Sequence, residues 1–231
     1  MFAVIFVVQP RQARWNDYLD LAKYLKPKLE AIDGFIDNER FESKRAPGRL
    51  LSLSTWRDEK AVVRWRTQGE HHGVQEKGRF EIFEDYHLRV GEIVHDTDPP
   101  AGLTVAESRV DVTETGTAKV ATITELTPEA ESDAAGSSPD MLPARLGLDA
   151  PRDGLVDAEV FASIYHPGKL LLLGLWQDID AAARWRPTQA APAGKLRHRR
   201  VRIIRDYGMF DRREAPQYYR SLERPRHLAA K

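Results

Sequence analysis

The first part of the chain alternates between strand-like and helix-like patterns of apolar residues. Phe2–Val8 is a continuous apolar run of the kind that a buried strand carries, and Gln9–Pro10 ends it. Segment 11–32 predicts a helix with a kink at Pro27, because its apolar residues recur at helical spacing. These residues are Trp15, Tyr18, Ala22, Leu25 and Leu29. The pattern therefore opens with a strand followed by a helix.

A hairpin, a second helix and a last strand follow. Gly34–Lys44 and Arg49–Trp56 predict two paired strands, since Pro47 and Gly48 between them supply the backbone dihedrals of a turn. Asp58 stands where the next helix begins, and after a short helical turn a strand over 79–94 closes the series. The order β-α-β-β-α-β around an antiparallel sheet predicts a ferredoxin-like domain of the α+β class.

This pattern occurs twice in the chain. Asp33–Arg66 returns as Asp153–Arg186, 120 positions later, with half of the positions identical. After a one-residue insertion, the alignment sets Arg79, Ile82, Asp85 and Tyr86 on Arg200, Ile203, Asp206 and Tyr207. We therefore expect two domains, residues 1–104 and residues 105–231, of which the second is a degenerate copy with a basic C-terminal tail.

The second copy keeps its strands and loses part of its helical layer. Its first strand is predicted over 119–126. The segment that follows opposes one long helix, because it contains residues that break helices. These are Gly136, Ser137, Ser138, Pro139 and Pro143. We therefore expect a single functional pocket in each chain, located in the first copy.

Composition restricts the classes of function. The 231 residues include 35 basic and 35 acidic side chains, so net charge gives no reason to expect nucleic acid or a membrane surface as partner. The absence of cysteine excludes disulfides, thiol catalysis and cysteine-ligated metals. The apolar N-terminus is typical of a strand rather than an export signal, and no other segment is long enough to span a bilayer. These features lead us to expect a cytoplasmic protein.

The region after the second helix resembles a known family. The residues that carry the resemblance are Trp65-Arg66, Glu70-His71, Gln75, Gly78-Arg79 and the following strand EDYHLRVGEIV. They are similar to those of the antibiotic biosynthesis monooxygenase-like family of the dimeric α+β barrel superfamily, over about residues 1–95 and, less closely, 119–215. Members pair ferredoxin-like protomers face to face, so the resemblance implies an intrachain pseudo-dimeric α+β barrel and leaves further self-association open. It also implies cofactor-free oxygenation of aromatic compounds or oxidative heme breakdown.

His71 and His72 are the sharpest chemical candidates. They follow Trp65 by 6 and 7 residues, and nothing similar stands at 189–192 in the second copy. A histidine can deprotonate a phenol or enol near neutral pH, and the electron-rich anion can then react with dioxygen. Neighbouring residues on a helix diverge by about 100°, so at most one of the two faces a pocket. A surface or capping role for both stays open.

Aromatic and amide side chains complete the predicted site. The resemblance makes Trp65 an aromatic wall against a planar substrate, whereas its counterpart Trp185 favours a packing role in both copies. Tyr86 and Gln9 are candidate donors to a substrate oxygen, and Tyr18 is a further candidate for substrate binding. A metal site built from the histidines lacks the usual ligand spacing. We expect neither a metal nor another cofactor.

These observations favour a cofactor-independent monooxygenase that acts on a planar phenol, quinol or polyketide-like compound. Two alternatives stay open. Heme binding or degradation is less favoured, because the heme-degrading relatives carry an asparagine on the first strand, where this chain has only the amide of Gln9. A non-catalytic binding or structural module is compatible with the degeneration of the second copy.

Overall fold

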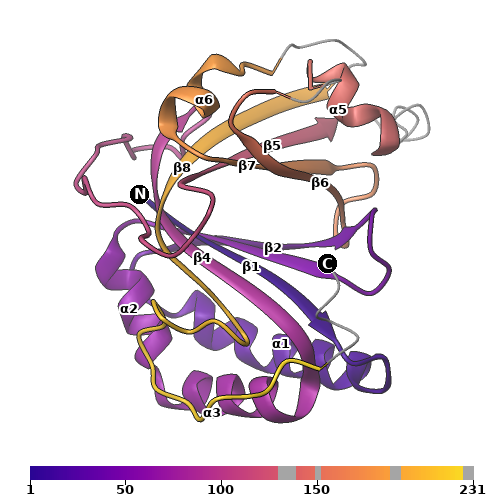
Figure 1. The fold of residues 1–231 in the computed structure, drawn as a ribbon, viewed down its shortest axis with the longest axis vertical. Coiled ribbons are helices and arrows are strands. Elements are labelled where there is room, and N and C mark those ends of the chain that lie inside the picture. Colours follow the sequence, from indigo (N-terminus) through magenta and orange to yellow (C-terminus); the bar gives the residue numbers. More distant parts are fainter. Residues whose placement is uncertain (130–138, 149–151, 188–193, 226–231) are drawn as a thin grey trace.

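The computed structural model describes residues 1–129, 139–148, 152–187 and 194–225. In this part of the chain, strands pair antiparallel throughout and close into one barrel in the order β1-β3-β2-β6-β7-β5-β8-β4. Figure 1 shows that β1 to β4 and their helices form one side of the molecule, and β5 to β8 form the other. The two sets of strands are contiguous in the sequence.

The first half contains its elements in the predicted order. They are β1 (Phe2–Pro10), a 3-10 turn (Gln12–Arg14), α1 (Trp15–Glu30), β2 (Phe35–Ser43), β3 (Leu50–Trp56), α2 (Glu59–Thr67), α3 (Gly69–Lys77), a π turn (Gly78–Ile82) and β4 (Phe83–Asp96). Asp58 caps α2 by accepting a hydrogen bond from the backbone nitrogen of Ala61, at 2.8 Å. Gly48 has a φ of 75°, which the hairpin turn requires. Helix α1 runs through Pro27 to Glu30 as one element, so the proline does not restart it.

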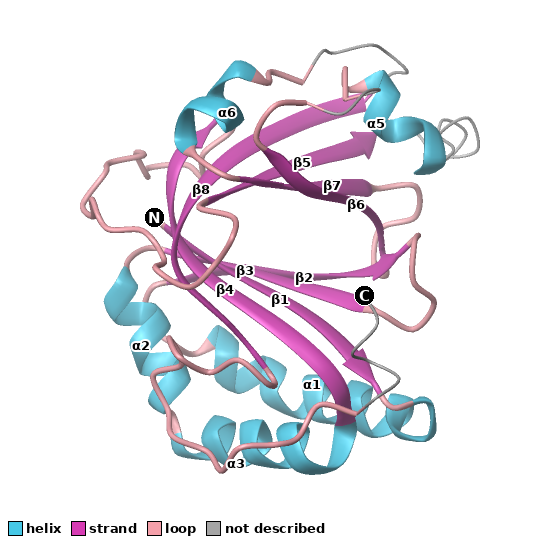
Figure 2. Cartoon of the chain, in the orientation of Figure 1, coloured by secondary structure: helices cyan, strands magenta, loops and turns pink. Residues whose placement is uncertain are grey.

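Among the described residues of the second half, the helices are shorter. Its elements are β5 (Val120–Pro128), a 3-10 turn (Pro139–Met141), α5 (Leu142–Arg145), β6 (Leu155–Ser163), β7 (Leu170–Trp176), α6 (Ile179–Arg184) and β8 (Gly194–Gly208). Helix α5 has 4 residues where α1 has 16. Pro139 lies in the 3-10 turn and Pro143 in α5, whereas Gly136, Ser137, Ser138 and residues 189–192 lie outside the described residues. In Figure 2 the first half accordingly carries the thicker helical layer.

Both halves contribute to the core inside the barrel. Alternate residues of each strand point inward, as the pleat of a strand requires. The buried cluster includes Ile5, Phe41 and Leu53 from the first half and Phe161, Leu173 and Ile203 from the second. The β2–β6 contact is short and pairs Phe41 with Ser163, Glu42 with Ala162 and Ser43 with Phe161. Because 41/161 and 43/163 are repeat counterparts, this register is unchanged when the two halves are exchanged.

The alignment of the last strand was wrong. The structure pairs Val8 with Tyr86 in the first half and Leu126 with Leu196 in the second. Position 196, and not Tyr207, is therefore the counterpart of Tyr86. Tyr207 lies instead beside Leu88 of β4, to which it is paired across the contact of the two halves. The identity of Asp85-Tyr86 with Asp206-Tyr207 was a coincidence in strands whose register is fixed by β1 and β5.

Candidate functional site

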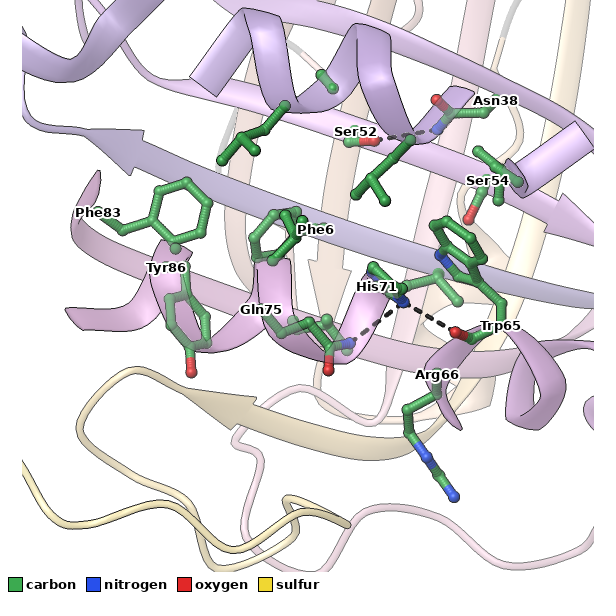
Figure 3. Close-up of a pocket in the computed structure, with 18 of the residues that line it drawn as sticks. Phe6, Asn38, Ser52, Ser54, Trp65, Arg66, His71, Gln75, Phe83 and Tyr86 are labelled. Carbon is green, nitrogen blue, oxygen red and sulfur yellow. Dashed lines mark hydrogen bonds between the residues drawn. The ribbon is translucent and has the colours of Figure 1, made fainter. Parts of the chain in front are cut away.

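An apolar pocket of about 210 Å³ lies between the sheet of the first half and its helices. Strand alternation explains its floor, because Val4 and Phe6 point to the helices while Ala3 and Ile5 point into the barrel. Figure 3 shows the aromatic side chains around this space. Its lining from α1 includes Tyr18, Leu21, Ala22, Leu25 and Leu29. The pocket thus occupies the layer that the sequence assigned to the helices of the first copy.

His71 is held as a neutral base in this pocket. Its Nδ1 lies 2.8 Å from the backbone oxygen of Trp65, and a carbonyl only accepts, so Nδ1 carries the hydrogen and Nε2 keeps a lone pair. The amide nitrogen of Gln75 is 3.5 Å from the same Nδ1, which is too long for an effective competing bond. Burial lowers the pKa of His71 to about 4, an effect that the bond to Trp65 partly opposes. The imidazole is therefore uncharged at neutral pH.

A break between two helices produces this geometry. Helix α2 ends at Thr67, and Gln68 takes an extended conformation before α3 begins. The side-chain oxygen of Gln68 caps α3 by accepting from the backbone nitrogen of His71, at 2.6 Å. The imidazole in turn donates to the carbonyl of Trp65 in the last turn of α2, where carbonyls lack helical partners. The rings of Trp65 and His71 stack with centroids 3.9 Å apart and an angle of 14° between their planes.

The second histidine lies outside the pocket. His72 is exposed, and its ring stacks on Tyr219 with centroids 5.9 Å apart. The hydroxyl of Tyr219 is 3.4 Å from Nδ1 of His72. The two histidines therefore diverge, and only His71 is in position to meet a ligand in this cavity.

The remaining predicted residues are divided between two places. Tyr18, Tyr86 and Trp65 all line the pocket with His71. Gln9 does not: it borders a separate polar cavity on the barrel side, because odd-numbered residues of β1 face the opposite way from Phe6. The prediction that Gln9 donates to a substrate bound at His71 is therefore wrong, because the two side chains lie on opposite faces of the sheet.

The floor of the pocket carries a polar patch that was not predicted from the sequence. Asn38 of β2 donates from Nδ2 to Oγ of Ser52 and to the backbone oxygen of Leu53, both at 3.0 Å. Ser54 and Arg40 also line the pocket. A comparison of the two copies would have revealed them. At the repeat counterparts of Asn38, Arg40, Ser52 and Ser54, the second copy has Ala158, Val160, Leu172 and Gly174.

The equivalent layer of the second half is filled by side chains. Trp185 is 2% exposed, donates from Nε1 to the backbone oxygen of Leu146 at 3.1 Å and stacks on Trp176. Leu142 and Leu172 pack in the same buried cluster. Trp185 follows the end of α6 in an extended conformation, whereas Trp65 lies within α2 and faces the cavity. The two tryptophans therefore differ in role despite their equivalent places in the sequence.

The C-terminal segment closes one side of the pocket. After β8 the chain returns over the helices of the first half, where Arg212, Gln217 and Tyr219 join the lining, as does Tyr207 near the end of β8. The guanidinium groups of Arg212 and Arg79 donate to the hydroxyl of Tyr86, at 2.8 and 3.2 Å. The basic tail is thus part of the site.

Two further properties of the described residues bear on metal ions and membranes. Among the described residues, no group of three or more histidine, aspartate or glutamate side chains is arranged to hold a metal ion. No helix in the described part of the chain combines the length and apolar character needed to cross a bilayer.

Comparison with known proteins gives one family and several similar folds. The family described as antibiotic biosynthesis monooxygenase matches residues 1–77. The chain is 40% identical over 225 residues to the Jasmonate monooxygenase ABM of Pyricularia oryzae. This alignment covers 95% of this chain and 98% of the relative. An aldoxime dehydratase solved with butyraldoxime has a TM-score of 0.54 at 14% identity, covering 88% of this chain and 79% of its own. An anthrone oxidase-like protein has a TM-score of 0.37 at 12% identity, covering 94% and 96%. At 14% identity the aldoxime dehydratase bears on the fold alone.

Proposed function

Since this chain belongs to the antibiotic biosynthesis monooxygenase family, we propose that the pocket of its first half is a monooxygenase active site with His71 as the base. The single observation that carries the proposal is the unprotonated Nε2 of His71 in an apolar pocket, with Nδ1 already committed to Trp65. A neutral imidazole next to a stacked aromatic ring suits a planar substrate that carries an acidic proton.

The chemistry follows from that arrangement. An anthrone loses a proton from its CH2 group, which lies between two aryl rings, to Nε2 of His71 and becomes an electron-rich enolate. One oxygen atom of dioxygen is then retained as a carbonyl on that carbon, and the other leaves as water with the two hydrogens of the CH2. The substrate supplies all the electrons, so the balance needs no further reductant. Ser52, whose hydroxyl accepts from Asn38 and keeps its own hydrogen, and Tyr86 are the lining side chains that can donate to the oxygen atoms of such a substrate.

The low pKa of His71 is compatible with this role. It keeps the imidazole free of a proton at neutral pH, where a histidine of ordinary pKa would be partly charged. When a substrate anion forms beside it, the attraction between opposite charges in a water-poor pocket favours the imidazolium. Proton transfer and formation of the ion pair thus assist each other.

A second substrate class has its own support. The relative that is 40% identical across 95% of this chain is described as a jasmonate monooxygenase, so a jasmonate is a second candidate substrate. Hydroxylation of a C–H bond differs from the anthrone reaction, because formation of water then requires two electrons from an added donor. The two candidates are therefore distinguished by whether turnover depends on a reductant.

Oxygen uptake with isotope labelling tests the proposal. Purified protein is incubated in 18O2 with anthrones and hydroquinones without additions, and with jasmonate in the presence and absence of a reduced nicotinamide. We expect one labelled atom in the product of at least one class. His71→Ala is expected to lower kcat by about 100-fold or more, the usual contribution of a general base, whereas His72→Ala changes it less than twofold. Retention of full activity in His71→Ala contradicts the assignment of the base, and lack of label in every product contradicts the reaction.

We also propose that the barrel is an intrachain pseudo-dimer of two ferredoxin-like halves, residues 1–104 and 105–231. Two contacts at the β2–β6 seam support this, because they are repeat counterparts of each other. Oγ of Ser43 donates to Glu159 at 2.5 Å, and Oγ of Ser163 donates to Glu39 at 2.6 Å. Contacts that recur when two halves are exchanged are typical of an isologous interface.

A further inference from the structure

The side of the pocket closed by the C-terminal segment is rich in arginine. Arg66 of α2 and Arg212 of the segment both line the cavity. Arg79 and Arg212 both donate a hydrogen bond to the hydroxyl of Tyr86. In Figure 3 the side chain of Arg66 and the hydroxyl of Tyr86 both point toward the C-terminal segment, drawn in pale yellow. Cationic groups from two halves of the molecule therefore converge at one end of an apolar pocket.

These arginines lack acidic partners. In the described part of the chain, no carboxylate lies within 4.0 Å of the guanidinium of Arg66, Arg79 or Arg212. Their neighbours in the sequence are paired: Arg64 with Asp33 at 3.4 Å and Arg213 with Asp211 at 2.5 Å.

Because these guanidinium groups are largely buried, the lack of a negative charge beside them is significant. Arg79 is 1% exposed, and the Nε atoms of Arg66, Arg79 and Arg212 are buried without a hydrogen-bond partner. Burial also raises the pKa of Tyr207 to about 12, so this neighbouring phenol stays neutral and supplies no negative charge. Several partly desolvated cations at one place are costly unless an anion joins them.

The C-terminal segment is fixed so that Arg212 is presented to the cavity. Arg79 donates to the backbone oxygens of Met209, at 2.5 Å, and Arg220, at 3.2 Å, which anchors both ends of the segment. The guanidinium of Arg212 lies over the ring of Tyr219, 5.0 Å from its centroid, and 5.6 Å from that of Tyr207. Stacking between two rings holds the planar group in one orientation before any ligand binds.

We propose that the substrate is an apolar carboxylic acid whose carboxylate binds Arg212 and Arg66, while its body lies against Trp65 and His71. This inference rests on the proposed function for the identity of the site, but it concerns recognition and not the reaction. Guanidinium groups bind carboxylates through paired, charge-assisted hydrogen bonds, and the apolar side chains that line the pocket from α1 can hold the body of the acid. The second half thus supplies the residue that selects for the acid.

Binding of acids and their methyl esters tests the proposal without turnover. The probes are jasmonate, decanoate and 2-naphthoate, each with its methyl ester, titrated calorimetrically into the full-length protein. We expect at least one acid to bind 10-fold or more tightly than its ester. Arg212→Gln and Arg66→Gln should each weaken that acid by 10- to 100-fold, as for loss of charge-assisted bonds, and change the ester less than twofold. Arg212→Lys should retain part of the preference.

Controls separate this proposal from its alternatives. Arg213→Gln, next in the sequence and exposed, should bind every probe like the unmodified protein. Equal binding of acid and ester for all three pairs overturns the proposal. A preference for the acid that is lost in Arg40→Gln but kept in Arg212→Gln overturns it as well. Because no step depends on oxygen, a clear acid preference without any labelled product would contradict the proposed monooxygenase reaction while supporting this site. Incorporation of 18O into esters and acids alike would support the proposed monooxygenase reaction and contradict this carboxylate site.

Discussion

At the scale of single residues, one backbone carbonyl determines the chemistry of the site. The oxygen of Trp65 has no i+4 partner because α2 ends within two residues of it; besides a 3.3 Å bond from the backbone nitrogen of Gln68 it accepts from His71, and it so fixes the hydrogen of His71 on Nδ1. Without that bond the two tautomers would be close in energy, and the lone pair would face the pocket only part of the time. In the second half Trp185 donates to Leu146 and fills the cavity, so the same sequence position serves packing alone.

The buried imidazole also makes stability depend on pH. Burial lowers the pKa of His71 to about 4, whereas in the unfolded chain it is about 6.5. Between these values the unfolded state binds a proton that the folded state excludes, so the free energy of unfolding falls as pH decreases from about 6.5 to about 4. The loss is at most on the order of 3 kcal/mol. His198 has a similarly lowered pKa through burial and adds to the effect.

Urea denaturation at pH 7 and pH 4.5 measures this dependence. We expect His71→Gln to lose less stability over that interval than the unmodified protein, because glutamine binds no proton in either state. His72→Gln serves as the matched control, since that side chain is exposed, and it should keep the original dependence. Identical losses in all three proteins would show that His71 is not buried in a neutral form.

At the scale of secondary structure, most elements could be predicted and the site could be predicted only in part. The continuous apolar run of β1 and the Pro47-Gly48 turn are local signals, so these elements lie where the sequence placed them. The divergence of His71 and His72 follows from helix geometry. The choice of His71 does not, because it depends on the break at Gln68, which rotates α3 relative to α2.

Long-range pairing explains the errors at this scale. The register of β4 against β8 contains two irregularities, between Val90 and Gly91 and between Ile93 and His95, which no local pattern reveals. The closure of the pocket by the C-terminal segment could not be predicted either, since Arg212 meets Tyr86 across 126 positions of sequence. The polar floor at Asn38 and Ser52 was predictable, by asking where the two copies differ in polarity rather than where they agree.

Glycine substitutions test the packing of β4 on β8. A Cβ at Gly91 would meet the backbone oxygen of Arg202 and lie 2.6 Å from Cγ1 of Val201. Gly91→Ala should therefore lower the free energy of unfolding by about 2–4 kcal/mol, as for overpacking in a core. Gly73 lies in α3 with nothing within 4 Å of its added Cβ, so Gly73→Ala should raise stability by about 0.5–1 kcal/mol. Thermal and urea unfolding of the two variants measure these changes. An unchanged free energy of unfolding in Gly91→Ala would contradict the close approach of β4 and β8.

At the scale of the whole molecule, the two halves of the barrel contribute different parts. The first half keeps long helices over a polar floor and so contains the pocket. The second half fills the equivalent space with Trp185 and leucines, and its strands complete the barrel. Its C-terminal segment then crosses to the first half and lines the pocket there. Both halves therefore line this pocket, although His71 lies in only one of them.

This division predicts how the chain behaves when it is cut. Separated from 105–231, the fragment 1–104 would leave the edges of β2 and β4 without partners and expose the inner apolar face that carries Ile5 and Leu53. We expect it to self-associate or aggregate and to show no preference for acids over esters, because it lacks Arg212. Co-expressed with 105–231, it should instead form a 1:1 complex.

Size-exclusion chromatography with light scattering measures these states, and calorimetry on the complex measures whether the acid preference returns. Recovery of both requires that the two halves find each other through the β2–β6 and β4–β8 registers alone, without the covalent connection. Arg212→Gln in the second fragment is the control, since it should allow assembly and abolish the preference. A 1–104 fragment that is folded and monomeric would contradict the shared barrel, because a half with its own complete core would have no apolar face left to bury against the other.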